Sequence, residues 1–206
     1  FVQFVIQLEP CLIGMEACSS SHYFARLFTR YGHEVKLIPP QYVKPYVKTN
    51  KTDAADAEAI CEAVTRPNMR FVQIKTEEQQ AVLALHTERG ILIRERIACA
   101  NSLRATLAEF GITIAAGQSH LTRELPAILE DGENGLSPFV RTSIYRQSKH
   151  IRELEEQVKQ VEEALASWYR TQEACQRMAK IPGVGMLTAT YVVAAVGNAR
   201  QFSTAK

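Results

Sequence analysis

Two aspartates three residues apart, Asp53 and Asp56, have the type and spacing to do chemistry. Thr52 precedes them as a candidate N-cap, since its hydroxyl can accept a hydrogen bond from the first turn of a helix. Residues three apart share one helix face, so both carboxylates can point to the same place. Paired carboxylates repel each other unless a cation lies between them, typically a divalent metal ion. The alternative is a solvated helix start, where the helix dipole favours acids.

Glu16 is a third candidate carboxylate, because it ends a short apolar run at 11–15 that predicts a buried strand. A helix that begins in the serines at 19–21 and a second buried strand at 35–38 follow. This order is typical of an α/β unit with parallel strands, whose functional groups gather beyond the carboxyl ends of the strands. We therefore expect the three acids to converge at one edge of the sheet and to bind Mg²⁺ or Mn²⁺. A solvated loop glutamate is the alternative for Glu16.

Two features predict contacts with phosphate groups. Lys44, Lys48 and Lys51 lie just before the aspartates and favour a phosphate-bearing partner. Near the end of the chain, a Pro-Gly-Val-Gly turn containing Gly183 and Gly185 leads into a predicted helix, whose first N–H groups form a ready anion site. Helix-hairpin-helix modules hold a nucleic-acid backbone in this way without reading its sequence. A tight connection between helices is the alternative.

The composition indicates a soluble globular protein of one good-sized domain or two small ones, with 206 residues, 46% hydrophobic and 22% charged. A net charge of only +2 argues neither for nor against nucleic acid. Five scattered cysteines without a CxxC pair indicate reduced thiols and argue against both a disulfide framework and a zinc site. No apolar run is long enough to cross a bilayer, and no signal peptide is recognisable. We expect a cytoplasmic protein without membrane association.

Two long amphipathic segments are predicted to form helices, at about 77–110 and 137–171, separated by a region at 111–135 broken by glycine and proline. The second helix has a heptad seam. The seam consists of Ile151, Leu154, Val158, Val161, Leu165 and Trp168. On the first helix, Arg89, Arg94, Arg96 and Arg104 are expected on the outer face. The helices either pack on each other as an antiparallel hairpin or pair with a second subunit.

Five stretches together resemble the DEDD-type insertion-sequence transposases, the Piv-related recombinases whose larger members use a non-coding bridge RNA. The stretches are Gly-Met-Glu-Ala-Cys at 14–18, Gly-His-Glu-Val at 32–35, Pro-Pro-Gln-Tyr-Val-Lys-Pro-Tyr at 39–46, Lys-Thr-Asp-Ala-Ala-Asp-Ala-Glu-Ala at 51–59 and Ile-Pro-Gly-Val-Gly at 181–185. They extend over nearly the whole chain and follow the order found in the family.

The resemblance implies an α/β fold with three parts. Residues 1–75 would form a partial RuvC-like catalytic domain of the ribonuclease-H type, 76–174 a long helical coiled-coil hairpin, and 175–206 the start of a C-terminal domain like a helix-hairpin-helix. Glu16, Asp53 and Asp56 would be three acids of the family's catalytic tetrad. We expect the fourth, an aspartate, before residue 1, and the family's serine nucleophile after residue 206.

The implied function is DNA transposition, by metal-dependent strand cleavage and exchange. The implied partners are DNA, a non-coding guide RNA and further copies of the protein, held through the coiled coil. Since a fourth acid and the serine are not among the 206 residues, we expect this chain alone to be an inactive fragment. Two alternatives are a non-catalytic module for nucleic-acid binding and subunit assembly, and a nuclease like the Holliday-junction resolvases.

Overall fold

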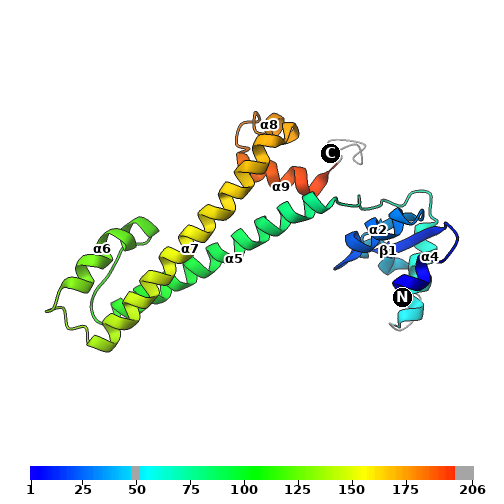
Figure 1. Cartoon of the computed structure of the whole chain (residues 1–206). Helices are drawn as coiled ribbons and strands as arrows, with labels where there is room; N and C mark the ends of the chain where they lie inside the picture. The colour runs from blue at the N-terminus through cyan, green and yellow to red at the C-terminus, as the bar shows by residue number, and fades with distance from the viewer. Residues whose placement is uncertain (48–51, 198–206) are drawn as a thin grey trace. The chain divides into compact units, whose positions relative to one another are not determined.

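The computed structural model describes residues 1–47 and 52–197 and contains two compact units. The N-terminal unit comprises Phe1–Ala81 and the segment that begins at Val192, and the second unit is Val82–Tyr191. Figure 1 gives the course of the chain. Within the described ranges, every helix is too short or too polar to cross a membrane.

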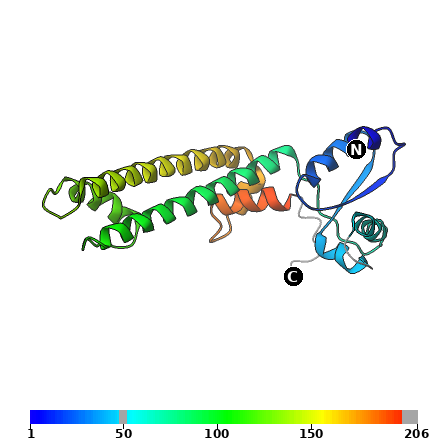
Figure 2. The ribbon, with the colours of Figure 1, turned by 90° about the horizontal axis from the view of Figure 1, so that it is seen from below.

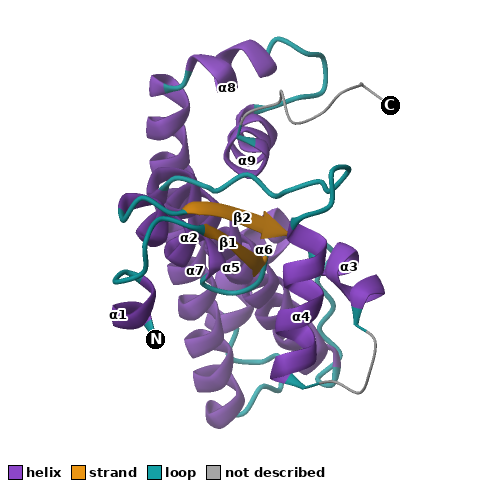
Figure 3. Cartoon of the chain, turned by 90° about the vertical axis from the view of Figure 1, so that its right-hand side faces the viewer, coloured by secondary structure: helices purple, strands orange, loops and turns teal. Residues whose placement is uncertain are grey.

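The N-terminal unit is built on two parallel strands joined by a helix (Figure 3). Its elements in chain order are α1 (Val2–Val5), β1 (Leu12–Glu16), α2 (Ser21–Arg30), β2 (Glu34–Ile38), α3 (Pro40–Val43), the 3₁₀ helix η1 (Lys44–Tyr46) and α4 (Asp53–Val64). The predicted strand, helix and parallel strand are confirmed. A parallel pair requires such a crossover, because its strands run in the same direction.

Helix α2 buries the face that carries Ala25 and Phe28, both of which are fully buried. Tyr23 on the same helix is instead 55% exposed. Two residues before Ala25 on a helix with 3.6 residues per turn, Tyr23 points away from the buried face. Its ring instead contacts that of Phe24, with the centroids 5.2 Å apart.

Helix α4 packs directly on β1 because Gly14 has no side chain. A Cβ at this position would lie 3.1 Å from both Ile60 Cγ2 and Val64 Cβ. Such distances are shorter than ordinary carbon–carbon contacts, so the helix would have to move. The same helix buries Ala59 and Ala63 against Ile38 of β2, in one hydrophobic cluster.

From a buried position, His33 connects the end of α1 to the starts of β1 and β2. Its Nδ1 accepts a hydrogen bond from the N–H of Cys11 at 3.3 Å, before β1. Nε2 must then carry the proton, which it donates to the carbonyl oxygen of Val5 in α1 at 3.1 Å. The histidine of the Gly-His-Glu-Val stretch therefore has a structural role.

The second unit is an antiparallel pair of long helices with smaller helices packed on it (Figures 1 and 2). Its elements are α5 (Glu77–Ala108), α6 (Gln118–Glu130), α7 (Pro138–Thr171), α8 (Glu173–Met178) and α9 (Met186–Val196), of which α5 and α9 each extend into the N-terminal unit. The hairpin is thus formed within one chain.

Cross-helix contacts set the antiparallel register. Arg89 of α5 pairs with Glu162 of α7 at 2.7 Å, and Glu95, six residues further along α5, pairs with His150, twelve residues earlier in α7, at 3.1 Å. Arg89 was expected on the outer face, and this was wrong: it lies at the helix interface. Of the predicted seam on α7, the residues from Ile151 to Leu165 are buried.

Helix α6 lies in the region that we expected to be broken, and it contains Pro126 in its interior. Leu121 and Leu125 project from the same face and are buried in the cluster formed with α5 and α7. Proline removes one backbone hydrogen bond from a helix, but burial of these two leucines offsets that loss. Phe110 follows the end of α5 and is 42% exposed.

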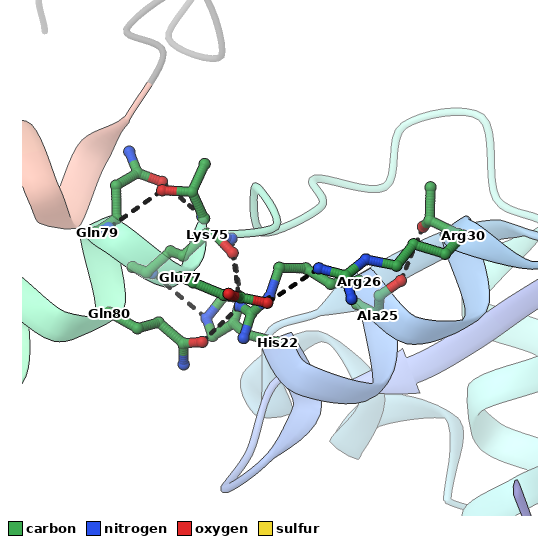
Figure 4. Close-up of polar contacts among 10 residues, drawn as sticks. His22, Ala25, Arg26, Arg30, Lys75, Glu77, Gln79 and Gln80 are labelled. Carbon is green, nitrogen blue, oxygen red and sulfur yellow. Dashed lines mark hydrogen bonds and ion pairs between the residues drawn. The ribbon is translucent and has the colours of Figure 1, made fainter.

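The start of α5 is fixed to α2 by polar contacts within the N-terminal unit (Figure 4). Arg26 donates to the carbonyl oxygen of Lys75 at 2.7 Å and to the side chain of Gln80. His22 Nδ1 accepts from the N–H of Lys75 at 3.2 Å, and Arg30 pairs with Glu77 at 3.0 Å. Burial, and next the charges of Lys75 and Arg26, lower the pKa of His22.

We predict that Gly14→Ala will destabilise the protein by about 1–3 kcal/mol, because the new methyl group overlaps Ile60 and Val64. Urea unfolding measures the change. Gly132→Ala is the matched control, since nothing lies within 4 Å of a Cβ there, and it should change stability by less than about 0.5 kcal/mol. Equal unfolding midpoints for the two variants would contradict the close packing of α4 on β1.

We also predict that stability will fall as the pH is lowered through the normal range of histidine, around 6.5. The pKa of His22 is lower in the folded protein than in the unfolded chain. The unfolded chain therefore takes up more protons, and the free energy of unfolding decreases with falling pH. His22→Asn keeps an acceptor for the Lys75 N–H and should flatten this dependence.

Some dependence on pH should remain in His22→Asn, since burial and next the charge of Arg89 also lower the pKa of His86. Urea titrations across the acidic range measure the slope for both proteins. The same slope in wild type and variant would show that His22 does not contribute.

Candidate functional site

The predicted start of the aspartate helix is confirmed. The hydroxyl of Thr52 accepts a hydrogen bond from the N–H of Ala55 at 3.2 Å, and α4 begins at Asp53. Asp53 is exposed and Asp56 is half-buried, both in the first turn of the helix. In this position the helix dipole stabilises their negative charges. The described residues offer neither aspartate an ion-pair partner, so both carboxylates are available.

Glu16 is the last residue of β1 and is half-buried. Alternate residues of a strand point to the same face of a sheet, so Glu16 lies on the same face as Gly14, which contacts α4. Ile38, its partner in the strand register, belongs to the cluster that α4 buries. The side chain of Glu16 therefore lies on the face of the sheet that α4 covers.

The structure does not gather the three carboxylates into one metal-binding group. In residues 1–47 and 52–197, no three histidine, cysteine, aspartate or glutamate side chains lie close enough together to hold a metal ion. The donor chemistry of Glu16, Asp53 and Asp56 suits a hard cation such as Mg²⁺, but the cation needs several oxygen ligands at once. Metal binding by these residues stays a prediction.

Of the three predicted phosphate-binding lysines, Lys44 is the one within the described residues, and Lys48 and Lys51 lie outside them. Lys44 is exposed and begins η1, the short helix that connects α3 to the segment before α4. Its position leaves the ammonium group accessible to a phosphate in solution.

The Pro-Gly-Val-Gly stretch forms an exposed turn between α8 and α9. Gly183 has a φ of +84°, which side chains other than hydrogen rarely allow, and the N–H of Val184 closes the turn on the carbonyl of Ile181 at 3.0 Å. Nothing lies within 4 Å of a Cβ placed on Gly183 or Gly185, so the turn is open. The predicted helix follows this turn as α9, which begins at Met186.

Helices α8 and α9 pack on each other below this turn. The thiol of Cys175 in α8 donates to the carbonyl oxygen of Ala189 in α9 at 3.8 Å, and both residues are fully buried. The first N–H groups of α9 have no partner within the helix, as at any helix start. The turn can therefore present N–H groups to an anion.

A hollow that the sequence did not predict lies beyond the C-terminal end of α4. We name it the tyrosine–arginine pocket. It is lined by Tyr42, Pro45, Tyr46, Arg66, Asn68, Met69 and Arg70, and its volume is about 300 Å³. Its residues come from two separate segments, 42–46 and 66–70. The spacing of four between the tyrosines and between the arginines was visible in the sequence, but nothing in it indicated that the two segments meet.

Comparison with known proteins identifies the family. Residues 3–112 match the DEDD transposase domain of IS110-type elements, described as a transposase. The chain is 40% identical to the transposase for insertion sequence element IS1328 of Yersinia enterocolitica, over 99% of the chain and 60% of that protein. It is 42% identical to a probable family 20 transposase of Pseudomonas aeruginosa, over 98% of the chain and 60% of that protein.

A further relative is the transposase for insertion sequence element IS1111A of Coxiella burnetii, with 42% identity over 98% of the chain and 56% of that protein. The chain thus spans 56–60% of the length of these three relatives. The family match itself extends over more than half of the chain and includes Glu16, Asp53 and Asp56. The chain belongs to the DEDD transposase family of IS110-type insertion sequences.

Proposed function

We propose that the protein containing this chain is an insertion-sequence transposase that cleaves and exchanges DNA strands, with Glu16, Asp53 and Asp56 among its metal-binding acids. The observation that carries the proposal is the family match over residues 3–112, which includes all three acids. Available carboxylates on α4, next to the strand face that carries Glu16, support the assignment.

DEDD transposases are generally metal-dependent. Glu16, Asp53 and Asp56, with a further acid of the family's tetrad, would hold Mg²⁺ or Mn²⁺. When bound, such an ion neutralises charge on the oxygens of a phosphate group that is being cleaved. The fold of this chain orients the acids, because the contact of α4 with Gly14 fixes the two aspartates relative to β1.

In this proposal the basic residues before α4 hold the DNA backbone beside the acids. Lys44, Lys48 and Lys51 contribute point charges, which bind phosphate regardless of sequence. The open turn at Gly183 and Gly185 offers a second phosphate contact through backbone N–H groups. A non-coding RNA would supply sequence choice. Further copies of the protein would associate through the long helices.

The second candidate function is a non-catalytic module for nucleic-acid binding and subunit assembly. One observation favours it: no group of three metal donors occurs in the described part of the chain. A nuclease like the Holliday-junction resolvases would share the α/β unit, but the relatives are named transposases along nearly the whole chain.

We predict that replacing both aspartates, Asp53→Asn and Asp56→Asn, will lower transposition by the complete protein at least about 100-fold, because metal ligands are lost. Asparagine keeps the size of the side chain. It removes both the repulsion between the two charges and their favourable interaction with the helix dipole, so the free energy of unfolding should fall by no more than about 1–2 kcal/mol. Glu109→Gln, at an exposed glutamate outside α4, is the control and should transpose normally. Normal transposition by the double variant would disprove the assignment.

Calorimetric titration with Mn²⁺ separates the two candidate functions. The complete transposase should bind the ion, and the Asp53→Asn variant should bind it at least about tenfold more weakly, since oxygen ligands determine the affinity. Binding should also weaken as the pH is lowered far enough to protonate carboxylates. An absence of Mn²⁺ binding by the wild-type protein would favour the non-catalytic module.

A further inference from the structure

The tyrosine–arginine pocket is a small hollow with mixed aromatic and cationic walls. Tyr42 and Tyr46 come from α3 and η1, while Arg66, Asn68 and Arg70 follow α4. Its volume of about 300 Å³ lies at the lower end of the range for small-molecule sites. Such a volume suits one small planar group with a polar substituent and excludes a stacked duplex.

The walls of the pocket are held in place by the core of the N-terminal unit. Tyr42, Tyr46 and Met69 pack against the cluster that contains Ile38, Val43 and the inner face of α4. The loop after α4 is closed by two backbone hydrogen bonds of 3.2 Å, from Arg66 N to the Ala63 carbonyl and from Met69 N to the Arg66 carbonyl. The pocket is therefore preformed, which lowers the entropic cost of binding.

The two arginines have different surroundings. Arg66 forms an ion pair with Glu62, and its guanidinium lies 5.5 Å from the centre of the Tyr46 ring. Arg70 is exposed and has no ion-pair partner in the part of the chain that the structure describes. The pocket thus combines a guanidinium already stacked on an aromatic ring with a second guanidinium that is available to an anion.

From this arrangement we propose that the tyrosine–arginine pocket binds one unstacked nucleotide of a single-stranded nucleic acid. The base lies against the tyrosine rings, because aromatic stacking accepts any base. Arg70 binds the adjoining phosphate through charge-assisted hydrogen bonds. The amide of Asn68, which both donates and accepts, reaches an edge of the base.

The chemistry of the walls favours this occupant over others. A duplex or a free phosphate ion would use the arginines but leave the tyrosines without a contact. A purely apolar ligand would bury the guanidinium groups without an anion, at a cost in free energy. A nucleotide in a single strand satisfies both kinds of wall, and such a strand can be DNA or RNA.

The pocket is separate from the proposed catalytic acids, although the proposal rests on the proposed function, which requires nucleic acid as a substrate. Asp53 begins α4 and Arg66 follows its end, and a helix of 12 residues is about 18 Å long. Substitutions at one end therefore leave side chains at the other end untouched. The two proposals can fail independently.

The test measures binding of the complete transposase to fluorescent oligothymidylate, oligouridylate and a DNA duplex of the same length. Arg70→Ala should weaken single-strand binding about fivefold or more. Arg146→Ala is the matched control, because it removes an arginine of α7 that is also exposed, and it should change binding less than about twofold. Equal losses in the two variants would overturn the proposal. The tighter single strand identifies DNA or RNA as the source.

Tyr46 provides the second comparison. Tyr46→Phe keeps the ring and should bind like wild type, whereas Tyr46→Ala should lose about as much affinity as Arg70→Ala. If Tyr46→Ala unfolds, the photo-crosslinking of an iodouracil-containing oligonucleotide to wild-type protein replaces it. Crosslinks on Tyr42 or Tyr46 support the proposal, and crosslinks found only on other residues overturn it.

The variants also separate this proposal from the catalytic one. Asp53→Asn with Asp56→Asn should lose transposition yet bind the single strands like wild type. Normal transposition by that double variant, with weak binding by Arg70→Ala, would overturn the catalytic assignment and support the pocket. Tighter binding of the duplex than of either single strand would overturn the pocket, whatever the effect of the aspartates.

Discussion

The contact of α4 with Gly14 is the constraint on which the N-terminal unit depends. Gly14 has no side-chain carbon, so Ile60 and Val64 approach to within 3.1 Å of the position that a Cβ would occupy. This approach lets the small residues Ala59 and Ala63 be fully buried on the same helix. Because packed interiors tolerate little change in volume, the position of α4 over the sheet is fixed along its length.

Because α4 is fixed on the sheet, the residues at both of its ends are held in place, and these two groups of residues differ in chemistry. The N-terminal end of α4 carries Asp53 and Asp56, where the helix dipole is positive and favours acids. The C-terminal end is followed by Arg66 and Arg70, where the dipole is negative and favours cations. The helix therefore separates a region suited to a metal ion from a region suited to a nucleotide, and the packing at Gly14 holds both.

Local signals in the sequence were sufficient to predict the strands and helices of the α/β unit. The apolar runs predicted β1 and β2, and Thr52 predicted the start of α4 through its side-chain cap. These signals act between residues that are close in the chain. Helix α6 was missed, because Pro126 argues against a helix, while the burial of its leucines depends on α5 and α7. Arg89 was misplaced for the same kind of reason, since its partner Glu162 is far along the chain.

The candidate sites also differ in whether they depend on residues close together in the chain or far apart. The spacing of Asp53 and Asp56 follows from one helix and was predictable, whereas the tyrosine–arginine pocket requires the segment after α4 to return to β2, where Val72 N donates to the Leu37 carbonyl at 2.7 Å. Glu16 is an intermediate case. Its face of the sheet follows from strand alternation with Gly14, and a slip of one residue in β1 would turn it towards α2. The glycine that admits α4 thus also determines on which face Glu16 lies.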